Sequence, residues 1–229
     1  MKQWMSALAL TAAAAAAHAT PTVLYATDFD GNVTTASGVT AAWSGITTLG
    51  SGGSLVGFGG NFLWNTTVPA QASDLTLTGV SGYTSVTVSF RLAFVDSWDS
   101  TNGSPAPDLF NVTINGNGVA SLTCNSASGS FCDNGVGTNA SAFAQMFNNG
   151  SWNDLTRDVS VGQALAGNSM LLSLFAGGSG WQGGDDESWA IDNLSITGEP
   201  RGGGNVPEPG SLALVGVALA GLALRRRSR

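Results

Sequence analysis

Histidine and lysine, which serve as bases in nucleophilic catalysis, are missing from most of this sequence, and histidine is also a common zinc ligand. Its single histidine, His18, and its single lysine, Lys2, both lie within residues 1–19. Because that segment is expected to be removed, serine–histidine triads, serine–lysine pairs and histidine zinc sites are excluded from the remainder. Glycosidase-type carboxylate pairs stay possible in principle, but no spacing marks one. We therefore expect no enzymatic activity, with a glycan-active hydrolase as the weaker alternative.

Acidic residues are more informative candidates. Asp96, Asp99 and Asp108 stand in one segment rich in serine, asparagine, glycine and proline, between two predicted strands. Such a loop gathers oxygen ligands, and Ca²⁺ takes six to eight oxygens from carboxylates and carbonyls. The spacing of an EF-hand is absent. A structural calcium site and a solvated acidic loop are the two interpretations that remain open.

A second acidic set is divided between the two ends of the predicted domain. Asp28 and Asp30 follow the first predicted strand, and Asp192 lies in the last one. First and last strands often pair in a β-sandwich, and carboxylates brought together in this way repel one another and raise one another's pKa. A bound divalent cation would relieve that repulsion. The acidic run 185–187 either joins one of these sites or forms a solvated turn.

Tryptophan is the candidate for contact with sugars, because its ring face stacks on sugar rings. Trp98 and Trp181 lie in segments rich in glycine and aspartate, so we expect them at the surface as ligand-binding residues. The alternative is packing in the core. That alternative is favoured for Trp189, which lies in a strand pattern.

The charge of the middle of the chain excludes two classes of partner. Residues 21–199 hold two arginines against fourteen acidic residues, which gives a net charge of −12. Nucleic acid and anionic lipid both need a basic face on the protein. We therefore expect that neither binds here.

Alternating patterns predict that β-strands position these residues. Residues 86–94 alternate between large apolar and mostly polar side chains. The pattern recurs in residues 75–78, 110–114 and 189–196. Asn115-Gly116 predicts a hairpin to a strand over 119–123. Helical periodicity is scarce, and many short strands separated by turns favour an all-β fold over residues 20–199, an antiparallel β-sandwich of the jelly-roll type.

The first 19 residues have the pattern of a secretory signal peptide. Lys2 gives the positive start, an apolar run follows, and Ala17 and Ala19 are the small residues that signal peptidase requires. We expect cleavage after Ala19. Because an exported protein meets an oxidising compartment, Cys124 and Cys132 are expected to form a disulfide that closes a short loop.

The C-terminal end consists of a linker and an apolar tail. A glycine-rich linker spans residues 200–205, and the fourteen residues 211–224 carry no charge before an arginine-rich end at 225–229. Fourteen helical residues span about 21 Å, which is less than the roughly 30 Å of a bilayer core. The tail is therefore predicted to be a short hydrophobic helix and a temporary anchor, with the arginines on the cytoplasmic side.

Pro207-Glu208-Pro209, the short helix and the arginine end together resemble the PEP-CTERM sorting domain of Gram-negative bacteria, over residues 206–229. This resemblance implies recognition by an exosortase, cleavage near the Pro-Glu-Pro motif and transient anchoring in the inner membrane. It also implies a final place at the cell surface or outside the cell, together with exopolysaccharide and biofilm production.

Residues 94–116 and 186–196 resemble bacterial lectin-like or carbohydrate-binding jelly-roll domains. In those domains an Ile-Asp-Asn of the final strand and acidic residues near the first strand hold a structural Ca²⁺, and the resemblance implies the same here. We therefore expect an exported, non-catalytic protein that contacts exopolysaccharide through a calcium-stabilised domain. The alternative is a structural component of the biofilm or envelope without a specific sugar ligand.

Overall fold

The described part of the protein is its predicted β-domain. The computed structural model describes residues 20–51, 55, 57–68, 70–100, 104–125, 131–133, 143–144, 154–184 and 186–202, with the backbone alone for 131–133 and 143–144. The chain divides into one unit over Pro21–Arg201 and another made of Met1–Thr20 and Gly202–Arg229. The predicted signal peptide and sorting tail lie outside the described residues. Within those residues no helix is long and apolar enough to cross a membrane.

All regular structure in the described part of the chain is β-strand. The fourteen strands are β1 (Thr22–Thr27), β2 (Val33–Thr35), β3 (Thr40–Gly45), β4 (Leu49–Ser51), β5 (Asn61–Asn65), β6 (Ser73–Thr78), β7 (Tyr83–Asp96), β8 (Leu109–Ile114), β9 (Asn117–Asn125), β10 (Phe131–Asp133), β11 (Phe143–Ala144), β12 (Asp154–Ala164), β13 (Ser169–Gly177) and β14 (Glu187–Pro200). The all-β class predicted from the alternating patterns is confirmed.

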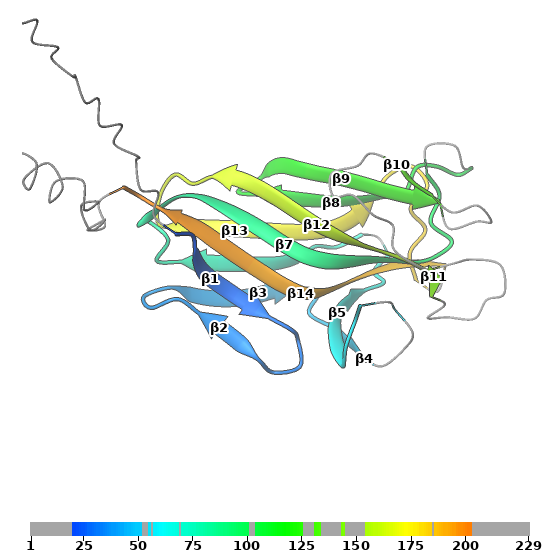
Figure 1. Ribbon diagram of the computed structural model, residues 1–229. Helices are drawn as coiled ribbons and strands as arrows, with labels where there is room; N and C mark the ends of the chain where they lie inside the picture. Colours follow the sequence, from blue (N-terminus) through cyan, green and yellow to red (C-terminus); the bar gives the residue numbers. More distant parts are fainter. Residues whose placement is uncertain are drawn as a thin grey trace, which may run out of the picture. The chain divides into compact units, whose positions relative to one another are not determined.

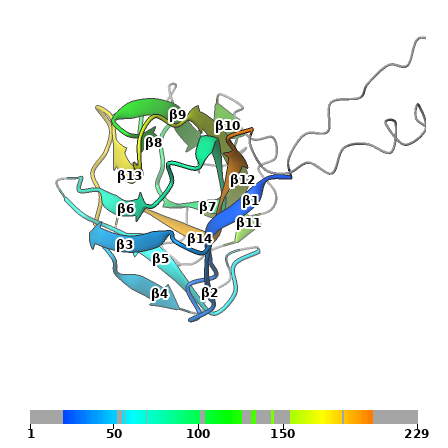
Figure 2. The same cartoon turned by 90° about the vertical axis from the view of Figure 1, so that its left-hand side faces the viewer.

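Two antiparallel sheets contain all of these strands. Sheet A runs in the order β11-β12-β7-β14-β1-β2, with β5 also paired to β14 and β4 paired to β5. Sheet B has the order β10-β9-β8-β13-β6-β3. Figure 1 shows the long strands β12, β7 and β14 side by side, and Figure 2 shows the two sheets from a view turned by 90°.

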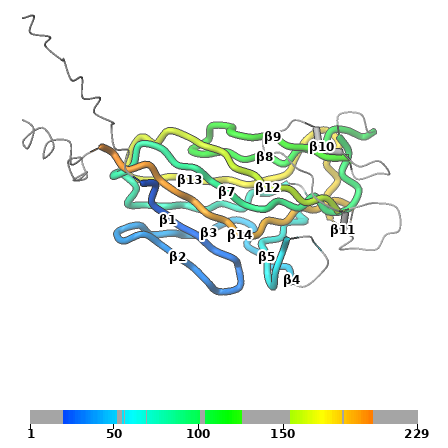
Figure 3. The backbone as a smooth tube through the Cα atoms, viewed as in Figure 1, coloured from blue at the N-terminus to red at the C-terminus, as the bar shows by residue number. Residues whose placement is uncertain are grey.

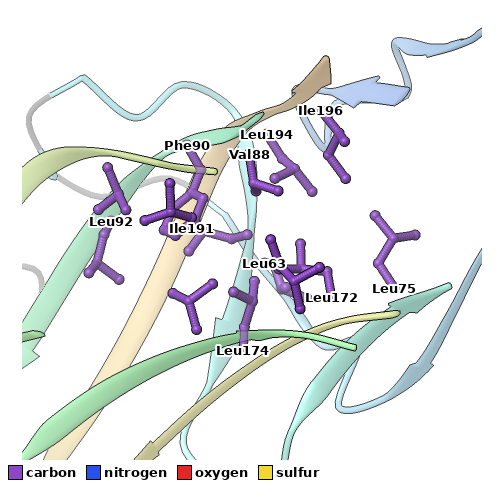
Figure 4. Packing of buried hydrophobic residues seen from close by; sticks show 14 of the residues in the cluster. Leu63, Leu75, Val88, Phe90, Leu92, Leu172, Leu174, Ile191, Leu194 and Ile196 are labelled. Carbon is purple, nitrogen blue, oxygen red and sulfur yellow. The ribbon is translucent and has the colours of Figure 1, made fainter. Parts of the chain in front are cut away.

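Apolar side chains from both sheets fill the space between them. Every second residue of β7 points into this core and is at most 3% exposed. These residues are Val86, Val88, Phe90, Leu92 and Phe94. Figure 4 shows Phe90 and Leu92 with Leu172 and Leu174 of sheet B. Full burial of a side chain of this size contributes about 1.5–3 kcal/mol, so the alternation predicted for residues 86–94 is what holds the sheets together.

Both faces of sheet A are buried at the end of β7, where the simple alternation stops. Ala93 and Val95 pack in a second cluster with Leu55, Phe62 and Ala190. The cause is the segment that leads into β5, which covers the outer face of the sheet here. Figure 3 traces β5 beside β14, in agreement with the pairing of the two strands.

Two local predictions are confirmed by strand pairing. The first strand of the domain pairs with the last, β1 with β14, from Thr22 opposite Gly198 to Thr27 opposite Leu194. The β8–β9 hairpin closes through Asn115 and Gly116, whose φ values of 53° and 77° are both positive. Both residues adopt the left-handed conformation that a two-residue hairpin turn requires.

The two cysteines face each other across a strand pair. Cys124 of β9 stands directly opposite Cys132 of β10 in the register. Cys124 is disulfide-bonded and fully buried. The side chain of Cys132 lies outside the described set, so its bond to Cys124 stays a prediction that this register accommodates.

Candidate binding groove and buried carboxyl pair

A groove of about 670 Å³ lies on the outer face of sheet A. It is lined by Gly57, Ser89, Phe90, Arg91, Asp158, Val159, Ser160 and Asn193. Most of these belong to β7 and β12, whose register places Arg91 opposite Asp158 and Ser89 opposite Ser160. The groove therefore exists because the outward positions of two neighbouring strands carry small or polar side chains.

Two side-chain contacts organise the floor of this groove. Arg91 donates from Nε to Oδ1 of Asp158 and from Nη2 to Oδ2, both at 2.8 Å. Ser89 Oγ donates to Ser160 Oγ at 3.1 Å. This bidentate ion pair fixes the orientation of the guanidinium. The Asp158 side chain remains 71% exposed and accessible to a ligand.

A second hollow of about 260 Å³ adjoins the first. Its lining comes from β1, β2 and β14 and includes Asp28, Asn32 and Thr34. The two hollows share Asn193, which has a positive φ of 52° and lies where the register of β14 shifts against β7. Polar side chains thus border the outer face of sheet A from β12 across to β2.

Asp28, Asp30 and Asp192, here called the terminal acidic set, lie close enough for their charges to interact. The charges of Asp30 and Asp28 act on Asp192, whose pKa is raised mainly by burial and further by these two carboxylates. The pKa of Asp28 is instead lowered, chiefly by a hydrogen bond from the Asn32 side chain. Pairing of β1 with β14 brings the turn after β1 beside the middle of β14.

Backbone and side-chain N–H groups already satisfy this terminal set. Asp192 accepts from Gly59 N at 3.0 Å and from Asn193 N at 2.6 Å. Asp30 accepts from Asn61 N at 2.6 Å, and Asp28 accepts from the backbone of its own turn. Among the described residues no three acidic, cysteine or histidine side chains are placed to hold a metal. Asp28, Asp30 and Asp192 therefore show no unmet need for a cation.

The acidic residues of the loop after β7 are Asp96, Asp99 and Asp108. Asp96 is buried at the end of the strand, and the other two are joined by hydrogen bonds. Asp96 ends β7 with a positive φ of 74°, and its N–H donates to Asp154 Oδ1 at 3.0 Å. Asp99 and Asp108 are joined through their backbones, since Asp99 N donates to Asp108 Oδ2 at 2.6 Å and Asp108 N donates to Asp99 O at 2.8 Å. The solvated loop considered above does not apply to Asp108, which is fully buried.

Glu187 lies with Asp108, which agrees with one of the two alternatives left open for residues 185–187. A solvated turn was one interpretation of residues 185–187, yet Glu187 is only 1% exposed because it opens β14 against β7, opposite Asp96. Burial raises its pKa to about 8, and the charges of Asp108 and Asp186 add to the shift, while N–H groups of Gln182 and Gly183 oppose it. An acidic run directly before a strand was the available signal.

Asp108 and Glu187 form a buried carboxyl pair. Burial raises the pKa of Asp108 to about 6, with the charges of Asp99 and Asp186 adding to the effect. The two carboxyls lie close enough for each to shift the pKa of the other. When both are ionised, Asp108 Oδ1 and Glu187 Oε1 have no hydrogen-bond partner. This pair is the least satisfied cluster of charge among the described residues.

The expected surface position of Trp98 is wrong. Its side chain is fully buried, donates from Nε1 to Ser188 O at 2.7 Å and packs edge-on against Phe94 with ring centroids 4.7 Å apart. Trp181 packs against Trp98 with the two ring centroids 5.3 Å apart, and it is itself half-buried. The loop after β7 folds back onto the end of the core, which draws its aromatic residue inward.

Residues 205–227 match the PEP-CTERM protein-sorting motif. This match covers the predicted Pro-Glu-Pro, apolar and arginine segments. It implies a protein that is exported, processed by an exosortase and sorted to the cell surface.

No curated protein matches the chain. Among solved structures, the β-domain distantly resembles the enzymatically active domain of tailspike protein 4 from bacteriophage CBA120. The two chains are 15% identical with a TM-score of 0.31, and the match covers 70% of this chain and 19% of the tailspike chain. A likeness of this size carries no argument about activity.

Proposed function

We propose that this is a non-catalytic protein of the cell surface or extracellular matrix, whose β-domain contacts exopolysaccharide along the outer face of sheet A. The observation that carries the proposal is the open groove floored by the Arg91–Asp158 pair. The sorting motif supports the location, because a domain sorted to the cell surface would meet exopolysaccharide there.

The chemistry of the groove suits a sugar chain. Hydroxyl groups of sugars both donate and accept hydrogen bonds, and the floor offers a carboxylate, a guanidinium, hydroxyls and an amide. Two hollows that meet at Asn193 give a surface longer than a single small pocket. Of the predicted ligand-binding tryptophans, Trp98 is too deep to stack on a sugar, and Trp181 keeps a part-exposed face.

The order of strands supports the jelly-roll part of the proposal. Four strands of sheet A lie in the order β1-β14-β7-β12, and four of sheet B in the order β6-β13-β8-β9. Following the chain through these eight strands gives two interlocked Greek keys, the arrangement that defines a jelly roll. The short strands β2, β3, β4, β5, β10 and β11 extend the edges.

A glycan-active hydrolase is less well supported by the described residues than a non-catalytic binding protein. The groove on sheet A has one carboxylate in its lining, Asp158. The buried pair Asp108–Glu187 has no exposed surface for a substrate. Glycosidase carboxylates flank the scissile bond of a bound substrate, which two fully buried side chains cannot do.

A structural component without a specific sugar ligand is the second candidate. The burial of Trp98 favours it, because this aromatic residue serves the core. In that case the domain would act in the matrix by its bulk and by self-association. In both candidate functions we propose calcium as an ion that stabilises the domain.

Blocking the groove tests the proposal. Ser160 is an exposed groove residue of β12, and Ser121 of β9 is an exposed serine on sheet B. We expect Ser160→Tyr to weaken binding of the processed protein to exopolysaccharide by about tenfold or more, since about 1.4 kcal/mol of lost contact suffices. Ser121→Tyr is the matched control and should bind normally. Binding is measured by co-sedimentation with the polysaccharide and on a glycan array.

Two outcomes would contradict the proposal. Equal binding by wild type and Ser160→Tyr would remove the groove as the contact surface. Failure of the wild type to bind any glycan, with or without calcium, would favour the structural component.

A further inference from the structure

Two segments meet where the buried carboxyl pair lies. Asp108 ends the loop after β7, and Glu187 begins β14 after the loop that follows β13. Their exposed fractions are 0% and 1%. The loops also touch through Trp98 and Trp181 and through Gly180 N, which donates to Pro107 O at 3.1 Å. The acidic pair thus sits inside a junction between two loops.

One oxygen of each carboxyl has a donor, and the other has none. Asp108 Oδ2 accepts from Asp99 N, and Glu187 Oε2 accepts from Gln182 N at 2.8 Å. Asp108 Oδ1 and Glu187 Oε1 are buried without a partner. An unsatisfied buried carboxylate oxygen is costly, so a positively charged partner would be strongly favoured here.

The charges that act on this pair are all negative. They come from Asp99 and Asp186, in addition to the two members themselves. Within the part of the chain that the structure describes, no lysine or arginine charge acts on either carboxyl. A proton shared between the two neutralises one charge, whereas a divalent cation neutralises both.

A backbone carbonyl lies beside the unpartnered oxygen of Asp108. The position that a Cβ at Gly180 would occupy is 2.6 Å from Asp108 Oδ1 and 2.8 Å from Pro105 O. Glycine at this position leaves both oxygens uncovered by a side chain. Carboxylate and carbonyl oxygens in a loop are the ligands that Ca²⁺ takes, in a geometry looser than Mg²⁺ requires.

We propose that Asp108 and Glu187 bind a calcium ion together with carbonyl oxygens of the 104–108 segment, and that this ion ties the loop after β7 to the loop before β14. The proposal deepens the calcium part of the proposed function by giving the ion a site in which Glu187 replaces Asp96 as a ligand. It does not involve the groove on sheet A.

The test compares the processed protein in chelator and in excess calcium. For the wild type we expect the melting temperature to rise by about 5–10 °C at a calcium concentration about 100 times the Kd. Glu187→Gln keeps the shape but removes a ligand charge, and should abolish the rise. Glu199→Gln changes an exposed residue of the same strand and should leave the rise intact.

A second measurement does not depend on unfolding. Tb³⁺ takes the place of Ca²⁺, and its luminescence should be excited through Trp98 and Trp181, which lie in the two loops. Glu187→Gln and Gly180→Ala, which places a methyl group against Asp108 Oδ1, should both lose this signal while retaining the native circular dichroism spectrum.

Three results would overturn the proposal. They are a wild-type melting temperature indifferent to calcium, a calcium effect retained in Glu187→Gln, and a calcium effect lost only in Asp192→Asn. The last would assign the ion to the terminal acidic set. Polysaccharide binding is measured separately with Ser160→Tyr, so a failed calcium test and a failed binding test remain distinguishable.

Discussion

Glu187 and Glu199 lie on the same strand, β14, and differ in their surroundings. Glu199 is exposed, whereas Glu187 is buried against β7 beside Asp108. Burial disfavours the charged form of a carboxyl, and nearby carboxylates disfavour it further. The same residue type is therefore exposed to solvent at one end of the strand and buried beside another carboxyl at the other.

At the residue scale we predict that the metal-free domain loses stability as the pH rises. The folded-state pKa values of Asp108 and Glu187 are raised to about 6 and about 8, above the ordinary values of 3.8 and 4.5. The folded protein then holds protons that the unfolded chain releases. Their contribution is complete below about pH 4 and is lost as the pH rises through about 6 and about 8.

Urea unfolding in chelator across this pH range checks the prediction. Asp99 and Asp186 face the pair and act in the same direction, so the profile belongs to the cluster. Glu187→Gln should flatten the profile, and Glu199→Gln should leave it unchanged. A Glu187→Gln profile as steep as that of the wild type would contradict the assignment.

At the scale of elements, β14 determines how the domain is assembled. It pairs with β7 along its length, with β1 in its second half and with β5 in its first half. The register shift between Asp192 and Ser195 lies where the partner changes from β5 to β1. Asn193, displaced at this point, is therefore available to both hollows of the outer face.

The β8–β9 turn gives an element-scale prediction. Gly116 has a φ of 77° and no atom within 4 Å of the Cβ position, so Gly116→Ala meets backbone strain but no clash. We expect a loss of about 1 kcal/mol in the free energy of unfolding. Gly118→Ala, two residues on and without a positive φ, should change it by no more than a few tenths. Thermal unfolding of both variants measures the difference.

At the scale of the whole molecule, the sorting motif and the β-domain perform separate tasks. Residues 205–227 carry the signal for processing, and the sheets over Pro21–Arg201 carry the candidate contact surfaces. Replacing Pro207, Glu208 and Pro209 by alanine should stop processing without changing the fold of the domain.

Immunoblots of cell fractions measure this last prediction. The variant should accumulate as a larger, membrane-associated form, whereas the wild type should appear in the processed form. A β-domain variant such as Ser160→Tyr serves as the control and should be processed normally. Equal processing of the motif variant and the wild type would contradict it.

Much of the fold was predictable from the sequence because strand patterns are local. Alternation along 86–94 reports which side chains face the core, and Asn115-Gly116 reports a turn that few other pairs can make. The additional cover over Ala93 and Val95 was not predictable, because it comes from residues 55–62, some thirty positions earlier. Patterns within a segment do not show which other segment packs on it.

The candidate sites show the same division. Acidic residues in the loop after β7 were recognised, but the partner of Asp108 proved to be Glu187, about eighty positions later. Trp98 was expected in solvent because its neighbours are polar, yet its loop folds onto the core. The groove on sheet A combines serines and charged residues from β7 and β12 with Asn193 of β14, and none of these residues is distinctive by itself.

The sequence by itself determined the sorting motif, the all-β class, and the lack of histidine and lysine after residue 19. Those properties depend on residue types and on spacings of a few positions, which a linear chain displays directly. Only the tertiary structure decided which carboxyls are buried together, which tryptophan is covered and where polar side chains line a groove. Such properties depend on segments far apart in the chain, and antiparallel pairing of β14 with β7, β1 and β5 is what brings them into contact.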